Sequence, residues 1–341
     1  MRENPDGFPS SPGASRAAAP IPVYRWAQLR NRFASPRLGV IRDKVMAGGT
    51  PANPATPAGW ESGRTGTRGQ LPTIWGVVSE IPAFEQVLLA VEGHVATVTL
   101  NRPEQRNPLS AVMLRDLATA FRWCQNELEV RVVVLTGAGD RAFCAGADLS
   151  GFDGGMTDLE RHRSRDLFVE LFALMASLGK PIVGRINGHA LAGGLGLACS
   201  CDLLVSTDTA TFGTPEINVG IWPMMIQAIL SRNLPRKVLL EMEMLGDRWT
   251  ATQLEAFGVI NRVVPHDQLD GAVKEMTDKL ARKSPLAMRL GRDSFYRQQD
   301  MEFRAALDFL HSQFTLTTLT EDSKEGIKAF FEKREPDFKG K

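Results

Sequence analysis

Apolar runs of strand length alternate with amphipathic helical stripes along this chain from about Pro82 onward. The candidate strands lie at residues 87–91, 95–100, 131–136 and 181–186. Helical stripes are predicted at residues 111–127, with Ser110 as the N-cap, and at about 167–178. Strands that alternate with helices favour an α/β fold with a partly parallel sheet, which is the fold class that we expect.

The first 80 or so residues differ in composition, because they hold half of the chain's 20 prolines and many Gly, Ser, Ala, Thr and Arg residues. Such a segment buries too little apolar surface to offset its ordering entropy. We therefore predict a disordered extension at residues 1–82, or a start site placed too early with Met46 as the true beginning. A transit peptide is disfavoured because Glu3 and Asp6 stand at the very start. The expected core occupies residues 83–270, and a helical region follows at 271–341.

Charge and cysteine usage narrow the possible partners. A net charge of +1 gives no electrostatic argument for nucleic acid, and no apolar stretch reaches the roughly 18 residues that span a bilayer, so neither partner is expected. The cysteines are too few for a disulfide framework and lack zinc-ligand spacing. We expect buried free thiols, no metal, and a cytoplasmic protein. The four residues are Cys124, Cys144, Cys199 and Cys201.

Two glycine-rich segments follow predicted strands, at residues 135–149 and 187–196. Small residues let a ligand approach the backbone closely, and a helix N-terminus presents unpaired N–H groups. Amides from both segments could therefore hold one oxygen that becomes negatively charged during a reaction. Neither segment matches a P-loop or the dinucleotide G-x-G-x-x-G pattern. Tight turns and close helix packing are the alternative use of these glycines.

A single carboxylate, Glu216, follows the second glycine-rich segment, within residues 214–220. A carboxylate beside an anion pocket can accept and return a proton, and a helix cap or a salt bridge is the alternative role for this residue. Asp148 is better interpreted as a cap than as a catalyst. His189, the histidine nearest the pocket in sequence, is more typical of a core or wall residue than of a base.

Five ordered motifs carry a resemblance to a known family. They are NRPEQRNPL at 101–109, AFCAGADL at 142–149, GHALAGGLGLACSCD at 188–202, FGTPE at 212–216 and GIKAFFEKR at 326–334. In this order and spacing they resemble the enoyl-CoA hydratase/isomerase (crotonase) family, from about residue 84 to 340. The resemblance implies a spiral of ββα units with a C-terminal helical region that forms a homotrimer, commonly a dimer of trimers.

The resemblance also implies roles for individual residues. The amides of Ala147 and Gly193 would form the oxyanion hole, and Glu216 would move the proton. The substrate would be an acyl-CoA or enoyl-CoA thioester, in which CoA is part of the substrate and no separate cofactor is needed. The residues implied along CoA are Gln105, Arg106, Ala145, Asp148, Leu149, Phe330 and Lys333, of which Phe330 and Lys333 could come from a neighbouring subunit.

The chain departs from the family's pattern in two ways. Gly196 stands where hydratases carry their first catalytic glutamate, and Ser150 replaces a lysine that often contacts a CoA phosphate. The turn at 222–225, Trp-Pro-Met-Met, lacks the aspartate of hydroxyisobutyryl-CoA hydrolases, and dienoyl-CoA isomerases want acids at both places. Mitochondrial-type Δ3,Δ2-enoyl-CoA isomerases use only the glutamate at the Glu216 position.

Three hypotheses follow from these departures. The first is double-bond isomerisation of an enoyl-CoA, with Glu216 as the proton shuttle. The second is hydration by Glu216 alone, with Trp222, Met224 and Met225 as apolar neighbours under either reaction. The third is an acyl-CoA-binding protein that has kept the pocket and lost the chemistry. Fold analogy alone does not separate the three.

Overall fold

The computed structural model describes residues 79–148, 155 and 157–341 of the chain. All described residues belong to one compact unit, which lies within Leu71–Lys341. The predicted N-terminal extension falls almost wholly outside the described residues. Leu149 and Ser150 lie outside them too.

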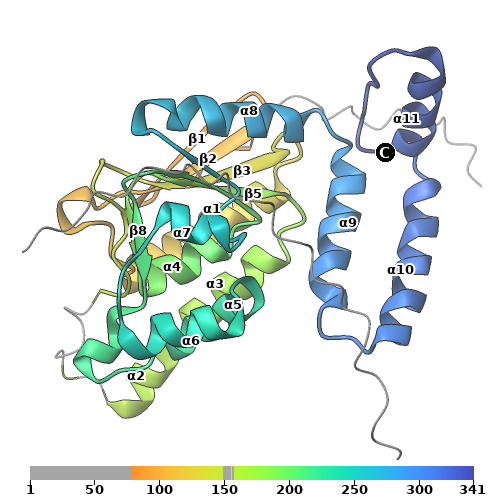
Figure 1. Cartoon of the computed structure of the whole chain (residues 1–341). Helices are drawn as coiled ribbons and strands as arrows, with labels where there is room; N and C mark the ends of the chain where they lie inside the picture. The colour runs from red at the N-terminus through yellow and green to blue at the C-terminus, as the bar shows by residue number, and fades with distance from the viewer. Residues whose placement is uncertain (1–78, 149–154, 156) are drawn as a thin grey trace, which may run out of the picture. The chain divides into compact units, whose positions relative to one another are not determined.

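Two sheets are formed by the described residues (Figure 1). The six-stranded sheet has the order β1-β2-β3-β5-β7-β10, in which only the β1–β2 pair is antiparallel. The four-stranded sheet has the order β4-β6-β8-β9, with an antiparallel β8–β9 pair. The strands are β1 Val87–Glu92, β2 Val95–Leu100, β3 Val132–Gly137, β4 Ala142–Cys144, β5 Ile182–Ile186, β6 His189–Leu191, β7 Leu203–Thr207, β8 Thr211–Gly213, β9 Trp249–Thr250 and β10 Arg262–Val264.

Helices fill the intervals between strands and make up most of the chain after Pro223. The α-helices are α1 Ala111–Asn126, α2 Asp158–Ser164, α3 Asp166–Ala176, α4 Gly193–Cys199, α5 Met224–Asn233, α6 Arg236–Leu245, α7 Ala251–Ala256, α8 Leu269–Ala281, α9 Pro285–Gln298, α10 Phe303–Thr318 and α11 Glu321–Glu332. Short 3-10 helices are η1 Pro103–Gln105, η3 Pro215–Val219 and η4 His266–Gln268.

The large sheet is covered on both faces, and strand β3 shows why its sequence is uniformly apolar. Side chains alternate across a strand, so Val132 and Val134 point to one face and Val133 and Leu135 to the other. The first pair packs with Leu269 and other residues of α8, while the second pair belongs to the larger core. Figure 1 shows α8 along one face of this sheet, with α1 and α3 on the other side. Burial on both faces is what a largely parallel sheet requires.

The sequence expectations for these elements are confirmed. Helix α1 begins after Ser110, whose hydroxyl accepts the Met113 amide at 3.1 Å. The predicted strands all form, with ends that move by no more than about two residues. All four cysteines are free and buried. No described helix is long and apolar enough to cross a membrane.

The predicted division at residue 270 falls at the start of α8. This helix packs on β3, β5 and β7, and Asp270 forms an ion pair with Arg185 of β5 at 2.6 Å. Helix α8 therefore belongs with the sheet in space. The antiparallel pair of α9 and α10 then follows, with α11 after it (Figure 1).

Candidate active site

A cavity of about 490 Å³ opens where both glycine-rich segments meet η3 and the start of α5. Its walls are largely apolar, which suits an acyl chain. The polar groups that reach it come from a few positions only, among them Glu216 and Asp148. The lining residues are Leu109, Ser110, Ala111, Leu114, Ala147, Asp148, Arg161, Ser164, Arg165, Phe168, Gly193, Glu216, Ile221, Trp222, Pro223, Met224, Met225 and Ile226.

The amides of Ala147 and Gly193 lie close together on one wall of the cavity. Ala147 pairs with Leu109 in a parallel bridge, in which Leu109 donates to the Gly146 carbonyl at 2.8 Å and Asp148 donates to the Leu109 carbonyl at 3.1 Å. Neither bond uses the Ala147 amide. Gly193 is the first residue of α4, so its N–H has no carbonyl partner within that helix. A Cβ on Gly193 would lie 3.6 Å from the Ala147 nitrogen, which shows how near the two amides are.

The backbone around these amides is held in conformations that few residues adopt. Ala192, the residue before α4, has φ 52° and ψ −129°, a combination that costs of order 1–3 kcal/mol outside glycine. Gly146 has φ 103°, and a Cβ there would lie only 2.7 Å from the Ala192 side chain. The two segments can therefore approach only because residue 146 is glycine. This close approach places the first residue of α4, Gly193, at the wall of the cavity.

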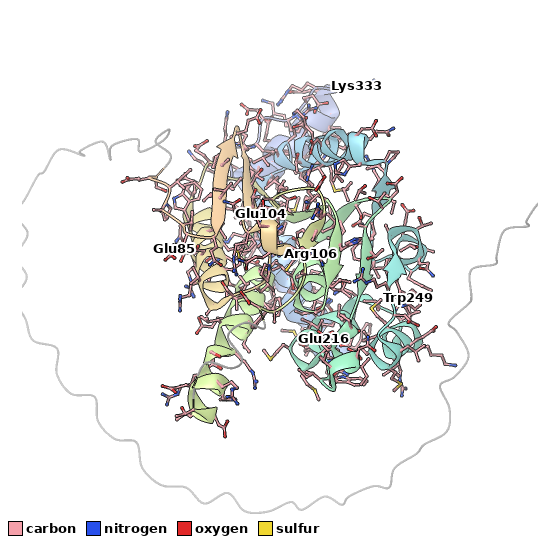
Figure 2. All side chains as sticks on the ribbon, turned by 90° about the vertical axis from the view of Figure 1, so that its left-hand side faces the viewer. Glu85, Glu104, Arg106, Glu216, Trp249 and Lys333 are labelled. Carbon is pink, nitrogen blue, oxygen red and sulfur yellow. The ribbon has the colours of Figure 1, made fainter. Side chains whose placement is uncertain are left out.

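Glu216 lies on η3, directly after Pro215, and faces the same cavity (Figure 2). Its Oε2 atom is buried and has no hydrogen-bond partner among the described residues. Burial raises the pKa of its carboxyl above the ordinary value of 4.5, and its own backbone amide opposes the rise. The expected apolar neighbours Trp222, Met224 and Met225 all line the cavity. A carboxyl with a raised pKa and one oxygen without a partner is suited to accepting and returning a proton.

The place beside Gly196 is filled by the side chain of Ile226. Gly196 lies inside α4, and a Cβ there would overlap the Ile226 side chain, with 2.7 Å to the Ile226 Cβ. Ile226 is 2% exposed and belongs to the main core, while its edge lines the cavity. The chain therefore lacks a carboxylate at this position, and an apolar side chain occupies the space that one would need.

A second carboxyl near Glu216 was missed in the sequence. Glu243 on α6 is fully buried, and the charge of Glu216 raises its pKa further than burial alone does. Glu243 itself does not line the cavity, whose described carboxylates are Glu216 and Asp148. The available signal was helical periodicity, because Leu239 and Glu243 are four residues apart and share the buried face of α6.

Comparison with known proteins adds to this geometry. The family model described as enoyl-CoA hydratase/isomerase matches residues 90–341. The chain belongs to this family. The short-chain-enoyl-CoA hydratase of Clostridium acetobutylicum is 32% identical over 256 residues, 74% of this chain and 96% of that protein. The 2,3-dehydroadipyl-CoA hydratase of Escherichia coli K12 is 34% identical over 260 residues, 76% of this chain and 100% of that protein.

Solved structures agree with the family assignment. The enoyl-CoA hydratase from Bacillus anthracis has a TM-score of 0.72 and 30% identity, and covers 75% of this chain and 100% of its own. The enoyl-CoA hydratase from Mycobacterium smegmatis has a TM-score of 0.72 and 32% identity, with 74% and 99% covered. The expected crotonase fold is confirmed, and the chain is an acyl-CoA enzyme of the enoyl-CoA hydratase/isomerase family.

Four of the residues implied along CoA lie in one strip of this family member. Ala145 donates its amide to the Arg106 carbonyl at 2.9 Å, and Arg106 follows Gln105 at the end of η1 in the left-handed region. The strip continues along the Leu109–Ala147 bridge to Asp148, which lines the cavity. Asp148 forms an ion pair with Arg102 at 2.7 Å, so its carboxylate already has a partner within the protein.

Phe330 lies on α11 and Lys333 directly follows that helix, and neither is among the residues that line the cavity. Phe330 is 78% exposed, and Lys333 ends the helix with φ 56°. In Figure 2 Lys333 lies at the opposite end of the view from Glu216. Within one chain, the structure therefore does not bring these two residues to the site.

Two buried asparagines, also missed in the sequence, fix the loops that shape the site. The Asn107 side chain accepts from the Arg102 amide at 2.9 Å and donates to the carbonyls of Ala138 and Ala142 at 3.0 Å. The Asn187 side chain accepts from the Gly137 amide at 3.2 Å and donates at 2.7 Å to a carbonyl in the same turn. These bonds tie the strip to the first glycine-rich turn. Asn187 could have been found as an amide side chain directly after the predicted strand at 181–186, whereas Asn107 follows no predicted strand directly.

Proposed function

We propose that this enzyme moves the double bond of an enoyl-CoA thioester, with Glu216 as the only group that carries the proton. The observation that supports isomerisation is the packing of Ile226 beside Gly196. Hydration is helped by a second carboxylate that holds the water, and here an apolar side chain takes that space. Isomerisation requires one base that can reach two carbons, and Glu216 lines the cavity without a competing partner for its Oε2 atom among the described residues.

The reaction follows from the positions of three groups. The Glu216 carboxylate takes the proton from the α-carbon of a 3-enoyl thioester, and the electron pair of the broken C–H bond delocalises into a dienolate. The thioester oxygen becomes negative and is held by the amides of Ala147 and Gly193. Glu216 then gives the same proton to the γ-carbon, which leaves the double bond between the α- and β-carbons. No cofactor beyond the CoA of the substrate is required.

The electrostatics of the cavity support this assignment. A base works best when its pKa is near the working pH, and burial moves the pKa of Glu216 upward from 4.5. The apolar wall of Trp222, Met224 and Met225 also excludes water from the dienolate. The expected pH profile rises with pH as Glu216 ionises.

Hydration of a 2-enoyl-CoA is the second candidate, and the names of the relatives favour it. Proteins at 32% and 34% identity are called short-chain-enoyl-CoA hydratase and 2,3-dehydroadipyl-CoA hydratase. In this reaction Glu216 alone would activate the water that attacks the β-carbon, and the same two amides would hold the enolate.

Purified enzyme assayed separately with 3-enoyl-CoA and 2-enoyl-CoA distinguishes the two candidates. We expect isomerisation by the wild type and a fall of about 100- to 10,000-fold in Glu216→Gln, the usual range for a lost acid–base group. Glu241→Gln is the matched control, because this residue is exposed on α6. Efficient hydration of the 2-enoyl thioester without isomerisation would reject the first candidate in favour of the second.

We further propose that the enzyme binds CoA along Gln105, Arg106, Ala145, Asp148 and Leu149, and that it assembles as a homotrimer or a dimer of trimers. In such an assembly Phe330 and Lys333 would reach the CoA of a neighbouring subunit. The exposure of Phe330 and Phe331, at 78% and 76%, supports an interface at α11.

A further inference from the structure

The buried carboxyl of Glu243, near Glu216, has no hydrogen-bond partner among the described residues. Glu243 has 0% of its surface exposed, and both of its carboxyl oxygens lack a partner. A fully buried carboxylate without a partner is very unfavourable, so such a group keeps its proton. Glu243 does not line the cavity, which distinguishes its role from that of Glu216.

Helix α6 is fastened to η3 on both sides of Glu243. Before it along the helix, the Thr214 hydroxyl donates to the Met242 carbonyl at 3.1 Å. After it, Gly246 approaches so closely that a Cβ there would lie 2.8 Å from the side chains of Ile217 and Asn218. The segment that carries Glu216 is therefore packed on the turn of α6 that carries Glu243.

Glu216 is the charged group that acts on Glu243. It is the one titratable residue of η3, and its charge raises the pKa of Glu243 after the larger effect of burial. Helix α5 contributes Arg232, which pairs with Asp300 at 3.0 Å at the far end of that helix. The other charged residues of α6, namely Arg236, Lys237 and Glu241, are exposed.

We propose that Glu243 is a positioning residue for the base: in the active enzyme the Glu216–Glu243 pair carries one proton, Glu243 holds it, and ionisation of Glu243 ends activity at alkaline pH by placing two like charges at the base. The pair titrates as a unit in two steps, as interacting carboxyls do. The first step leaves the charge on Glu216, where the substrate needs it. The second adds a buried negative charge that pushes Glu216 out of position.

Stability tests the pair without reference to the reaction. The folded pKa of Glu243 lies above 4.5, so its contribution to stability is complete below that pH and is lost as the pH rises through the folded pKa. Glu243→Gln does not ionise and escapes this loss. Its melting temperature relative to wild type is expected to rise between pH 5 and pH 8.5, by about 2–4 °C. In the Glu216→Gln background, Glu243→Gln is expected to raise the melting temperature by less, because the charge of Glu216 is absent.

Activity tests the positioning role, which rests on Glu216 being the base in the proposed function. Glu243→Gln is expected to extend the alkaline limb of kcat by at least about one pH unit. Glu243→Asp restores a titratable group and is expected to restore the alkaline limb. Glu241→Gln, two residues earlier and exposed, leaves both the melting curve and the pH profile unchanged.

The outcomes separate this inference from the proposed function. Equal pH-dependent gains for Glu243→Gln with and without Glu216 would show that the carboxyls do not interact, and would overturn the pair whatever the reaction. An unchanged alkaline limb in a folded Glu243→Gln enzyme would overturn the positioning role. An enzyme that hydrates and does not isomerise would reject the proposed reaction but leave the melting-temperature comparison intact.

Discussion

Ile226 and Gly196 determine what occupies the space beside the cavity, and both contribute by packing. Glycine at 196 lets α5 approach α4 closely, and the buried Ile226 side chain then seals the space against water. A side chain added at position 196 would overlap the Ile226 side chain. The absence of a carboxylate at position 196 follows directly from the sequence, because this residue is glycine. What fills the space is a tertiary contact between residues 30 positions apart.

Gly196→Glu alone is expected to destabilise the fold without creating a hydratase. Overpacking costs about 1–3 kcal/mol, and an unpaired buried carboxylate adds to that cost. Gly196→Glu combined with Ile226→Ala is expected to recover stability and to gain hydration of 2-enoyl-CoA. Denaturant unfolding and a hydration assay measure the two effects. Ile226→Ala alone is the control, with an expected loss of about 2–5 kcal/mol from the cavity it leaves. Hydration of 2-enoyl-CoA by the Gly196→Glu variant without the Ile226 substitution would contradict this prediction.

At the level of elements, local signals placed helices and strands well. Helix α1 shows why, because its N-cap, its apolar stripe and its length all depend on residues 110–126 alone. The cap is expected to be worth about 1 kcal/mol, so Ser110→Ala should lower the melting temperature by roughly 2–4 °C. Thr119→Ala in the same helix is the control, because that exposed hydroxyl donates only to the Arg115 carbonyl. Thermal unfolding of both variants measures the difference, and equal losses would show that the Ser110 hydroxyl does not stabilise the helix end.

Helix α6 marks the limit of local signals. Its buried face was readable from the spacing of Leu239, Met242 and Glu243. That spacing does not predict that η3 is the element that packs on this face. The Glu216–Glu243 pair exists because the chain returns α6 to η3 through α5, and proximity of this kind depends on the whole fold.

For the whole molecule, substitution of an exposed aromatic residue of the C-terminal helices α10 and α11 tests the proposed homotrimer. Phe314 is exposed on α10, so Phe314→Asp is expected to weaken association by placing a charge in an apolar interface. Light scattering coupled to size-exclusion chromatography should show a shift from trimer or hexamer toward monomer. Ser312→Asp, also exposed on α10, is the control. A wild type that is monomeric at micromolar concentration would contradict the assembly.

The sequence by itself determined the class of fold and the family, and it predicted which residues would form the oxyanion hole and the base. These depend on short-range patterns: strand and helix periodicity, glycines at strand ends, and motifs within single segments. Only the tertiary structure decided that Ile226 fills the place beside Gly196, that Glu243 lies behind Glu216, and that Phe330 stays away from the cavity of its own chain. The reason is physical, because burial and electrostatic environment are properties of packed neighbours, which sequence spacing does not specify.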